Sequence, residues 1–351
     1  MDIEIPAELT AYLRAHRHVL ADETPRMRVL AGGVSNRTVL VERTVSAASP
    51  ASWVMKQALE KLRVAADWRS SPERIHREAA GMRALYEVAP SGSIPQLLFE
   101  DHEHHLLAMT AIAQPHENWK DLLLAGRIDD DLVDQFGRLL GEIHQRSHQR
   151  ASELAPAFAD RSFFDSLRID PYYRTSAAAC PEAAGFLALL IQESDGIRTA
   201  LVHGDYSPKN ILVREGRLVL LDHEVIHWGD PAFDLGFALA HLLSKAHHLR
   251  KDRARFAAAA VRFWMSYVRA AAAGADLQLQ PRAVRHGLGC LLARVAGRSP
   301  LEYLDAVARA RQRAAIVTLM ASPPRTISEL TTAFLAGISR AEGERSDRAD
   351  D

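Results

Sequence analysis

The sequence has few cysteines, no excess of positive or negative charge, and no long hydrophobic run. Its two cysteines, Cys180 and Cys290, lack a C-x-x-C spacing, which argues against a disulfide framework and predicts two buried thiols. The 43 basic and 44 acidic residues nearly cancel, so nothing indicates binding to nucleic acid or to a membrane. No run approaches the roughly 20 apolar residues that span a bilayer, and the N-terminal "MDIEIPAELTAYLRAH" lacks the features of a signal peptide. We therefore expect a cytoplasmic protein.

Two common nucleotide-binding motifs are also absent. The chain has no G-x-x-x-x-G-K-[ST] string, and "GLGC" at 287–290 lacks the third glycine and the preceding strand of a dinucleotide site. The histidine-rich "DHEHH" at 101–105 falls in a turn between two predicted strands, so we interpret it as a solvated turn rather than as part of a metallophosphatase centre. These observations exclude a P-loop enzyme and a dinucleotide-binding fold.

The residue pattern over 26–113 is typical of β-strands. "RMRVL" and "RTVLVERTV" flank the glycine turn "AGGVSN" and predict a hairpin, and "SWVMKQA" predicts a third strand. "SPERIHREAAGMRALYEV" predicts a helix that begins near Ser71 and Pro72. "IPQLLFED" and "HHLLAMTAIA" complete a unit of five strands and one helix.

The chain becomes helical after Pro115. A helix is predicted over "DDDLVDQFGRLLGEIHQRSH", two short strands surround "REGR" within 199–222, and helices continue from about Asp234 to Leu335. Because 351 residues exceed what one hydrophobic core usually organises, we expect two lobes. The predicted class is α+β, with an N-terminal lobe at 1–113, a hinge at about 109–113, a C-terminal lobe at 114–345 and a disordered tail at 346–351.

The polar groups follow one another in a specific order. A glycine turn precedes Lys56 on a strand and Glu78 on a helix, and "HGDYSPKN" then places Asp205 and Asn210 five residues apart. The same separation occurs in the H-R-D-x-x-x-x-N loop of protein kinases, and Asp222 follows one hairpin later. Transfer of a γ-phosphoryl group requires positioning, a lysine on the phosphates, metal-binding oxygens and a carboxylate near the attacking hydroxyl. The pattern predicts that chemistry.

Residues 201–236 resemble the core of the aminoglycoside phosphotransferase and choline kinase superfamily, and "GGVSN" and "VMKQALEKLRV" resemble methylthioribose kinases. The resemblance implies a bilobal, protein-kinase-like fold and an ATP- and Mg²⁺-dependent phosphotransferase, monomeric or homodimeric. Its acceptor would be a hydroxyl of a sugar, an amino alcohol or an aminoglycoside-like molecule. A protein kinase and an inactive kinase-fold binding protein remain alternatives, although the eleven residues between Asp222 and Asp234 are too few for a peptide platform.

The resemblance also implies roles for individual residues. Asp205 would face the substrate hydroxyl, and Lys56 would bind phosphate with Glu78 as its ion-pair partner. Asn210 and Asp222 would bind magnesium, while Glu224 is either a further metal ligand or a surface carboxylate. Three residues are expected to be structural: His203, Asp230 and Asp234, of which Asp234 also suits the cap of the following helix. Lys209 either reaches a phosphate or is solvated.

Two further groups would bind nucleotide and acceptor. The predicted phosphate turn consists of Gly32, Gly33, Val34, Ser35 and Asn36, and the predicted adenine contacts are the backbone groups of Met109, Thr110, Ala111 and Ile112. The predicted acceptor contacts are Tyr172, Tyr173, Arg174, Trp228, Arg294 and Arg298. Arginines suit a sugar or an anionic acceptor better than a cationic one. Methylthioribose kinases carry adjacent late arginines, whereas Arg294 and Arg298 are four apart, which puts methylthioribose itself in doubt.

Overall fold

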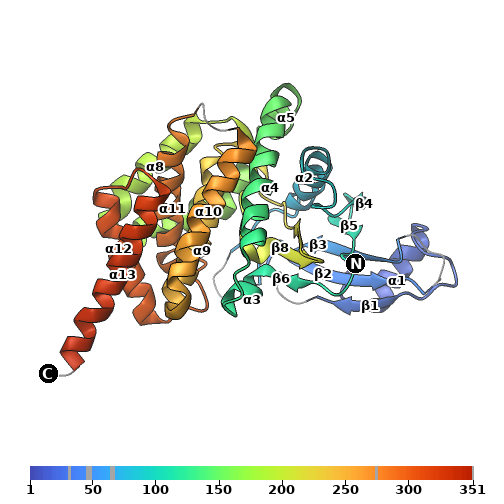
Figure 1. The fold of residues 1–351 in the computed structure, drawn as a ribbon. Coiled ribbons are helices and arrows are strands. Elements are labelled where there is room, and N and C mark those ends of the chain that lie inside the picture. Colours follow the sequence, from blue (N-terminus) through green and yellow to red (C-terminus); the bar gives the residue numbers. More distant parts are fainter. Residues whose placement is uncertain (31–32, 45–49, 64–67, 273–275, 350–351) are drawn as a thin grey trace.

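The chain folds into a sheet-containing lobe and a helical lobe that lie side by side (Figure 1). A computed structural model describes residues 1–30, 33–44, 50–63, 68–272 and 276–349, with side chains described up to residue 343. The bilobal α+β class expected from the sequence is confirmed.

The N-terminal lobe is built on one antiparallel sheet. The strand order is β1-β2-β3-β5-β4. The strands are β1 (Arg26–Val29), β2 (Asn36–Glu42), β3 (Ser52–Ala58), β4 (Leu97–Asp101) and β5 (Leu106–Thr110). Helix α2 (Arg74–Val88) is the helix predicted in this lobe, although it begins a few residues after Ser71. The five strands and one helix are confirmed.

Alternation along the strands sends apolar side chains to two small cores. On β5, Leu106 and Ala108 pack with residues of helix α1 (Pro6–Ala15), whereas Leu107 and Met109 pack with α2. This is the period of two expected of a strand covered on both faces. Helix α1 was missed by the sequence analysis. Its signals were Pro6 in the first turn and the buried pair Leu9 and Leu13 one turn apart.

The helical lobe packs closely around α4 (Asp130–Gln149), α9 (Ala232–His248) and α10 (Arg253–Ala271). A Cβ atom added at Gly141 of α4 would lie 2.8 Å from the Cβ of Ala270, so this glycine permits the backbones of α4 and α10 to approach. The remaining α-helices are α3 (Trp119–Leu124), α5 (Ala151–Ala157), α6 (Ser162–Phe164), α7 (Thr175–Ala179), α8 (Ala184–Gly196), α11 (Leu279–Ala296), α12 (Ala306–Ala321) and α13 (Ile327–Ala349).

Short elements at the border of the two lobes present the polar motifs. The hairpin predicted around "REGR" is β8 (Ile211–Arg214) and β9 (Arg217–Leu220), extended by β6 (Glu117–Asn118). Strands β7 (Ala200–Val202) and β10 (His227–Gly229) form a second antiparallel pair. The remaining short helices are a π-helix, η1 (Asp165–Arg174), and the 3₁₀ turns η2 (Pro181–Ala183), η3 (Pro208–Asn210) and η4 (Arg250–Asp252).

The capping role predicted for Asp234 is wrong. Helix α9 begins at Ala232, and its first backbone N–H, that of Ala232, donates to Asp230 Oδ1 at 3.0 Å, so Asp230 rather than Asp234 serves the start of this helix. Helix α13 spans Ile327–Ala349, so the predicted tail at 346–351 begins within the last turn of this helix. Both cysteines are buried and free, as predicted. Within the described residues, no helix is both long enough and apolar enough to traverse a bilayer.

Candidate active site

Both lobes contribute to one polar cleft. From the sheet lobe it is lined by Gly33, Ser35, Asn36 and Lys56, and from the helical lobe by Asp205, Lys209, Asp222 and Glu224, among others. Residues separated by almost 200 positions in the sequence therefore meet in one pocket. Gly32, predicted for the same turn, lies outside the described residues.

Lys56, on β3, lines this cleft and joins the two lobes. Its Nζ donates to Glu78 Oε1 on α2 at 2.6 Å and to Asp222 Oδ1 at 2.8 Å. Burial acts to lower the pKa of Lys56, but the charges of Asp222 and Glu78 outweigh it and raise that pKa. Burial likewise acts to raise the pKa of Asp222, and the positive charge of Lys56 reverses the effect. The lysine therefore stays protonated beside an ionised aspartate.

Asp205 is held in place by two neighbours. Asn210 Nδ2 donates to Asp205 Oδ2 at 2.8 Å, and the Arg168 guanidinium lies 2.9 Å from the same oxygen. Because both partners contact Oδ2, the Oδ1 atom of Asp205 is the one available to a ligand in the cleft. Arg168 comes from η1 and was missed by the sequence analysis, since no spacing relates it to the loop 37 positions later.

Buried side chains hold the loop that carries Asp205 in place. Asp234, fully buried on α9, accepts the backbone N–H groups of His203 at 2.7 Å and Gly204 at 2.8 Å. His203 Nδ1 in turn accepts the backbone N–H of Asp205 at 3.2 Å. Tyr206 packs on Phe136 of α4 with ring centroids 4.4 Å apart. These contacts fix the backbone on both sides of Asp205.

Gly204 tests how tightly this loop is built. Its φ is +76°, and a Cβ atom there would lie 2.8 Å from Val225 Cγ2, whereas Gly216 in the β8–β9 turn has φ +70° and open space around it. A left-handed conformation alone costs an alanine about 1–2 kcal/mol. We expect Gly216→Ala to lower the free energy of unfolding by that amount and Gly204→Ala by about 1–3 kcal/mol more, because of overpacking. Denaturant titration measures both, and equal losses would show that the loop yields freely.

Glu224 is buried, with 6% of its surface exposed, so the alternative of a surface carboxylate is wrong. Its Oε2 accepts from Arg74 Nε at 3.1 Å and lies 3.4 Å from Asn36 Nδ2. Burial and the negative charge of Asp222 raise the pKa of Glu224. Arg74, fully buried at the start of α2, also donates to the carbonyls of Leu59 and Ser35. It ties the glycine turn to α2 and was missed by the sequence analysis.

The oxygen atoms of the cleft suit a hard cation. Asn210 directs its amide nitrogen to Asp205, which leaves its carbonyl oxygen for another partner. Asp222 contributes a carboxylate, and both contacts of Glu224 use Oε2, so its Oε1 remains. Carboxylate and amide oxygens without sulfur or imidazole are the ligands that Mg²⁺ prefers. The residues present therefore fit a magnesium ion.

Two backbone N–H groups of the predicted hinge are already hydrogen-bonded to neighbouring segments. The backbone N–H of Thr110 donates to Gln96 O at 2.9 Å, and that of Ala111 donates to Ser52 O at 3.3 Å. The side chain of Met109 belongs to the core beneath α2. The backbone N–H groups of Thr110 and Ala111 are therefore engaged, which leaves their carbonyl oxygens for the predicted adenine contact.

The structure separates the six predicted acceptor contacts into two groups. Tyr172, Arg294 and Arg298 line the cleft, together with His241. The other three are not among the residues that line the cleft. Tyr173 is fully buried with its hydroxyl 2.8 Å from His286 Nδ1, Arg174 is paired with Asp170 at the surface, and Trp228 Nε1 donates to Arg198 O at 3.0 Å.

Comparison with known proteins identifies relatives of this chain. Methylthioribose kinases of Erwinia tasmaniensis and Klebsiella pneumoniae are both 27% identical to this chain, over 235 and 219 residues, or 58% and 54% of it. The alignments cover 57% and 53% of those kinases, so the chain spans about half the length of the curated relatives it matches.

Solved structures show the same fold. A choline/ethanolamine kinase family protein from Mesorhizobium loti aligns with a TM-score of 0.56 at 16% identity, over 95% of this chain and 99% of that one. An amicoumacin kinase bound to AMP-PNP and Ca²⁺ aligns with a TM-score of 0.54 at 13% identity, over 92% of this chain and 98% of that one. The model of the phosphotransferase enzyme family matches residues 26–274. This chain therefore belongs to the phosphotransferase enzyme family.

Proposed function

We propose that the protein is an ATP- and Mg²⁺-dependent kinase that transfers the γ-phosphoryl group to a hydroxyl of a small molecule. The observation that carries this proposal is the convergence of Lys56, Asp205 and Asp222 on one cleft, with Asn210 bonded to Asp205. Phosphoryl transfer needs little covalent help from a protein and depends on positioning and charge neutralisation, which these groups supply.

Nucleotide would bind under the glycine turn. Lys56, protonated and held by Glu78, would donate to the phosphates once they compete with Asp222 for its ammonium group. The turn around Gly33 and Ser35 lines the same cleft as Lys56, where its backbone N–H groups would face phosphate oxygens. We assign adenine recognition to the inter-lobe segment that includes Ile112.

Asn210 and Asp222 would hold the magnesium ion, and Glu224 Oε1 would serve a second ion. When bound, the metal neutralises charge on the phosphate oxygens. Asp205 would orient the acceptor hydroxyl and accept its proton at Oδ1, while Arg168 and Asn210 keep Oδ2 occupied. Lys209, which lines the same cleft, would face the transferred phosphoryl group.

The lining residues that are not assigned to nucleotide or metal support an acceptor class. They include Tyr172, His241, Arg294 and Arg298, and the three carboxylates among the described lining residues are those assigned to the chemistry. A polycationic aminoglycoside would meet arginines there rather than acidic partners. We therefore propose a sugar or another neutral or anionic alcohol as the acceptor.

A protein substrate is the less favoured alternative. After Asp222 the chain turns at once into β10 (His227–Gly229) and then α9, which begins at Ala232. The described residues between Asp222 and α9 therefore form no extended platform for a peptide. An inactive scaffold is also disfavoured, because Lys56, Asp205 and Asp222 are all present and placed together.

The proposal is tested by measuring ADP release against a panel of acceptors. The panel contains pentoses and their phosphates, methylthioribose, choline and ethanolamine, an aminoglycoside and a protein substrate. We expect Mg²⁺-dependent turnover with a sugar or anionic alcohol. Turnover only with the aminoglycoside would contradict the acceptor class, and failure to bind ATP would contradict the kinase assignment altogether.

Arg298 provides a second test of the acceptor class. Loss of a hydrogen bond to a charged partner costs about 1.5–3 kcal/mol, so Arg298→Ala should raise the KM of an anionic acceptor by about 10- to 100-fold, with the KM of ATP unchanged. Arg174→Ala is the matched control, because Arg174 lies outside the cleft and pairs with Asp170. Initial-rate kinetics with both substrates varied measure the effect. A change in the KM of ATP would instead place Arg298 at the nucleotide.

A further inference from the structure

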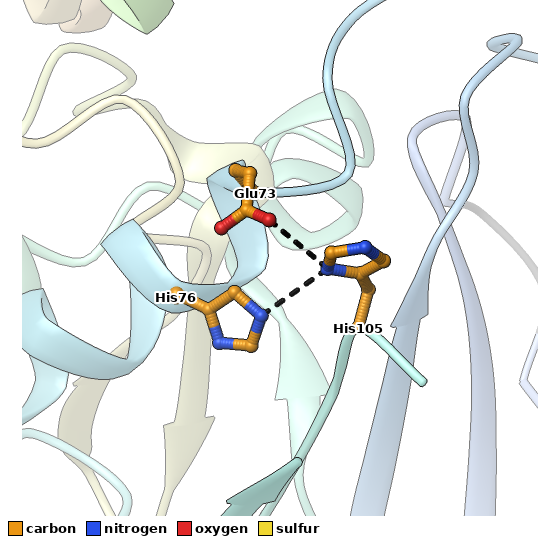
Figure 2. A group of neighbouring side chains, drawn as sticks. All are labelled: Glu73, His76 and His105. Atoms are coloured by element: carbon orange, nitrogen blue, oxygen red, sulfur yellow. Dashed lines mark hydrogen bonds and ion pairs between the residues drawn. The ribbon is translucent and has the colours of Figure 1, made fainter. Parts of the chain in front are cut away.

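A second group of polar side chains gathers on the N-terminal lobe, outside the cleft. Glu73 and His76 lie at the start of α2, and His105 lies at the end of the β4–β5 turn (Figure 2). His76 Nε2 is 3.3 Å from His105 Nδ1, and Glu73 Oε1 is 3.7 Å from the same Nδ1 atom. The three ligand atoms all lie within 4.8 Å of one another. Figure 2 shows the three side chains converging on the space between the helix and the turn.

We propose that Glu73, His76 and His105 bind a transition-metal ion, with zinc as the expected ion. A tetrahedral ion with Zn–N bonds of about 2.0–2.1 Å holds two nitrogens about 3.4 Å apart, close to the separation of the two imidazole nitrogens observed here. Two imidazoles and one carboxylate are a ligand set typical of zinc, and water would occupy the fourth position. The metal would replace the hydrogen bond that now joins the two rings.

An independent observation supports this ligand set. The other ring nitrogen of His76, Nδ1, lies 3.2 Å from Glu100 Oε2, and Arg83 holds the second oxygen of that carboxylate at 2.6 Å. A carboxylate that accepts the remaining N–H of a histidine fixes the ring and directs its free nitrogen to the metal. Glu100 therefore orients the His76 ring so that Nε2 faces the proposed metal position.

The neighbouring histidines are less suited to this role. His102 stacks on His76 with ring centroids 3.8 Å apart, and its Nε2 lies 3.8 Å from Glu100 Oε1, the oxygen that Arg83 already holds. His104 Nδ1 lies 3.0 Å from Asp101 Oδ2 and faces Tyr12 rather than His76. The turn "DHEHH" was interpreted as solvated. His105 of this turn is partly buried, and its contact His76 is 29 positions earlier and is brought to it only by the fold.

The position of this site connects it to the cleft. Glu73 adjoins Arg74, and His76 precedes Glu78 by two residues, so the first turns of α2 carry two of the proposed ligands together with the partners of Glu224 and Lys56. An ion that joins α2 to the β4–β5 turn would restrain this helix against the sheet. Binding to the folded state alone would also raise the melting temperature.

The proposal is tested by isothermal titration of Zn²⁺ into the chelator-treated protein without nucleotide. We expect one saturable site and a rise in melting temperature on adding zinc. His105→Ala and His76→Ala should each remove both effects, and Glu100→Gln should weaken binding by about 10- to 100-fold. His104→Ala, from the same turn, is the matched control and should bind as the wild type does. Co²⁺ in place of Zn²⁺ should give the visible spectrum of a tetrahedral site.

Two results would overturn the proposal. One is an absence of saturable binding in the wild type. The other is binding that survives in both His105→Ala and His76→Ala, because the ion would then occupy the oxygen ligands of the cleft. Loss of binding in His102→Ala but not in His105→Ala would likewise contradict this ligand set. Circular dichroism of each variant verifies that it is folded, and none of these readouts depends on kinase activity.

Discussion

Replacing Asp205 by asparagine is expected to lower kcat by about 10²- to 10⁴-fold, the usual contribution of a positioned general base. Asparagine keeps the size of the side chain and an oxygen for Arg168 and Asn210, but its amide cannot accept the proton of the acceptor hydroxyl. Lys56 and Asp222 are untouched, so binding of MgATP should stay close to that of the wild type. Coupled ADP release measures kcat, and calorimetry measures nucleotide affinity.

The control for this variant is Asp170→Asn. Asp170 is also an aspartate paired with an arginine, but it lies on η1 at the surface. It should leave both kcat and MgATP affinity unchanged. If Asp205→Asn kept turnover within a few fold of the wild type, Asp205 would not be the base. If its melting temperature fell steeply, the unpaired charge of Arg168 would be the cause, and the kinetics would be repeated below the transition.

Local patterns in the sequence predicted the elements that carry the chemistry. The alternation in "RTVLVERTV" and the acidic start of "DDDLVDQFGRLLGEIHQRSH" indicate a strand and a helix by themselves, and both are present as β2 and α4. The H-G-D-x-x-x-x-N string is short enough for its own backbone to bring Asn210 to Asp205. Helix α1 was missed because it is short and its burial depends on the sheet that covers it.

The partners that position the cleft could not be predicted, because they meet only through the fold. Arg74 contacts Glu224 across 150 positions and Arg168 contacts Asp205 across 37, and nothing near either arginine distinguishes it from a surface residue. The reverse error occurred at Tyr173 and Trp228, which resemble ligand contacts in sequence but serve the core. Residue type and spacing predict the chemistry of residues that are close together in the sequence. Which polar residues are buried is decided by long-range packing, which the spacing does not reveal.

Asp222 is the second residue whose replacement we expect to change activity strongly. Its backbone conformation determines which substitution is suitable for the test. Its φ is +70°, a conformation that asparagine tolerates far better than alanine. Asp222→Asn therefore removes the charge without adding backbone strain. Lys56 keeps its bond to Glu78, so the lysine retains a carboxylate partner and the cleft should remain folded.

We expect Asp222→Asn to weaken the Mg²⁺-dependent binding of ATP by at least about 10-fold, because an amide oxygen replaces an anionic ligand. Loss of charge stabilisation on the transferred phosphoryl group should also lower kcat by about 10²- to 10³-fold. Titration of Mg²⁺ at fixed ATP separates the two effects, since a lost ligand raises the half-saturating metal concentration whereas a merely structural change does not. Asp170→Asn again provides the unchanged reference. If Asp222→Asn bound MgATP as the wild type does, Asp222 would not be a metal ligand. Its only assigned role would then be the ion pair with Lys56.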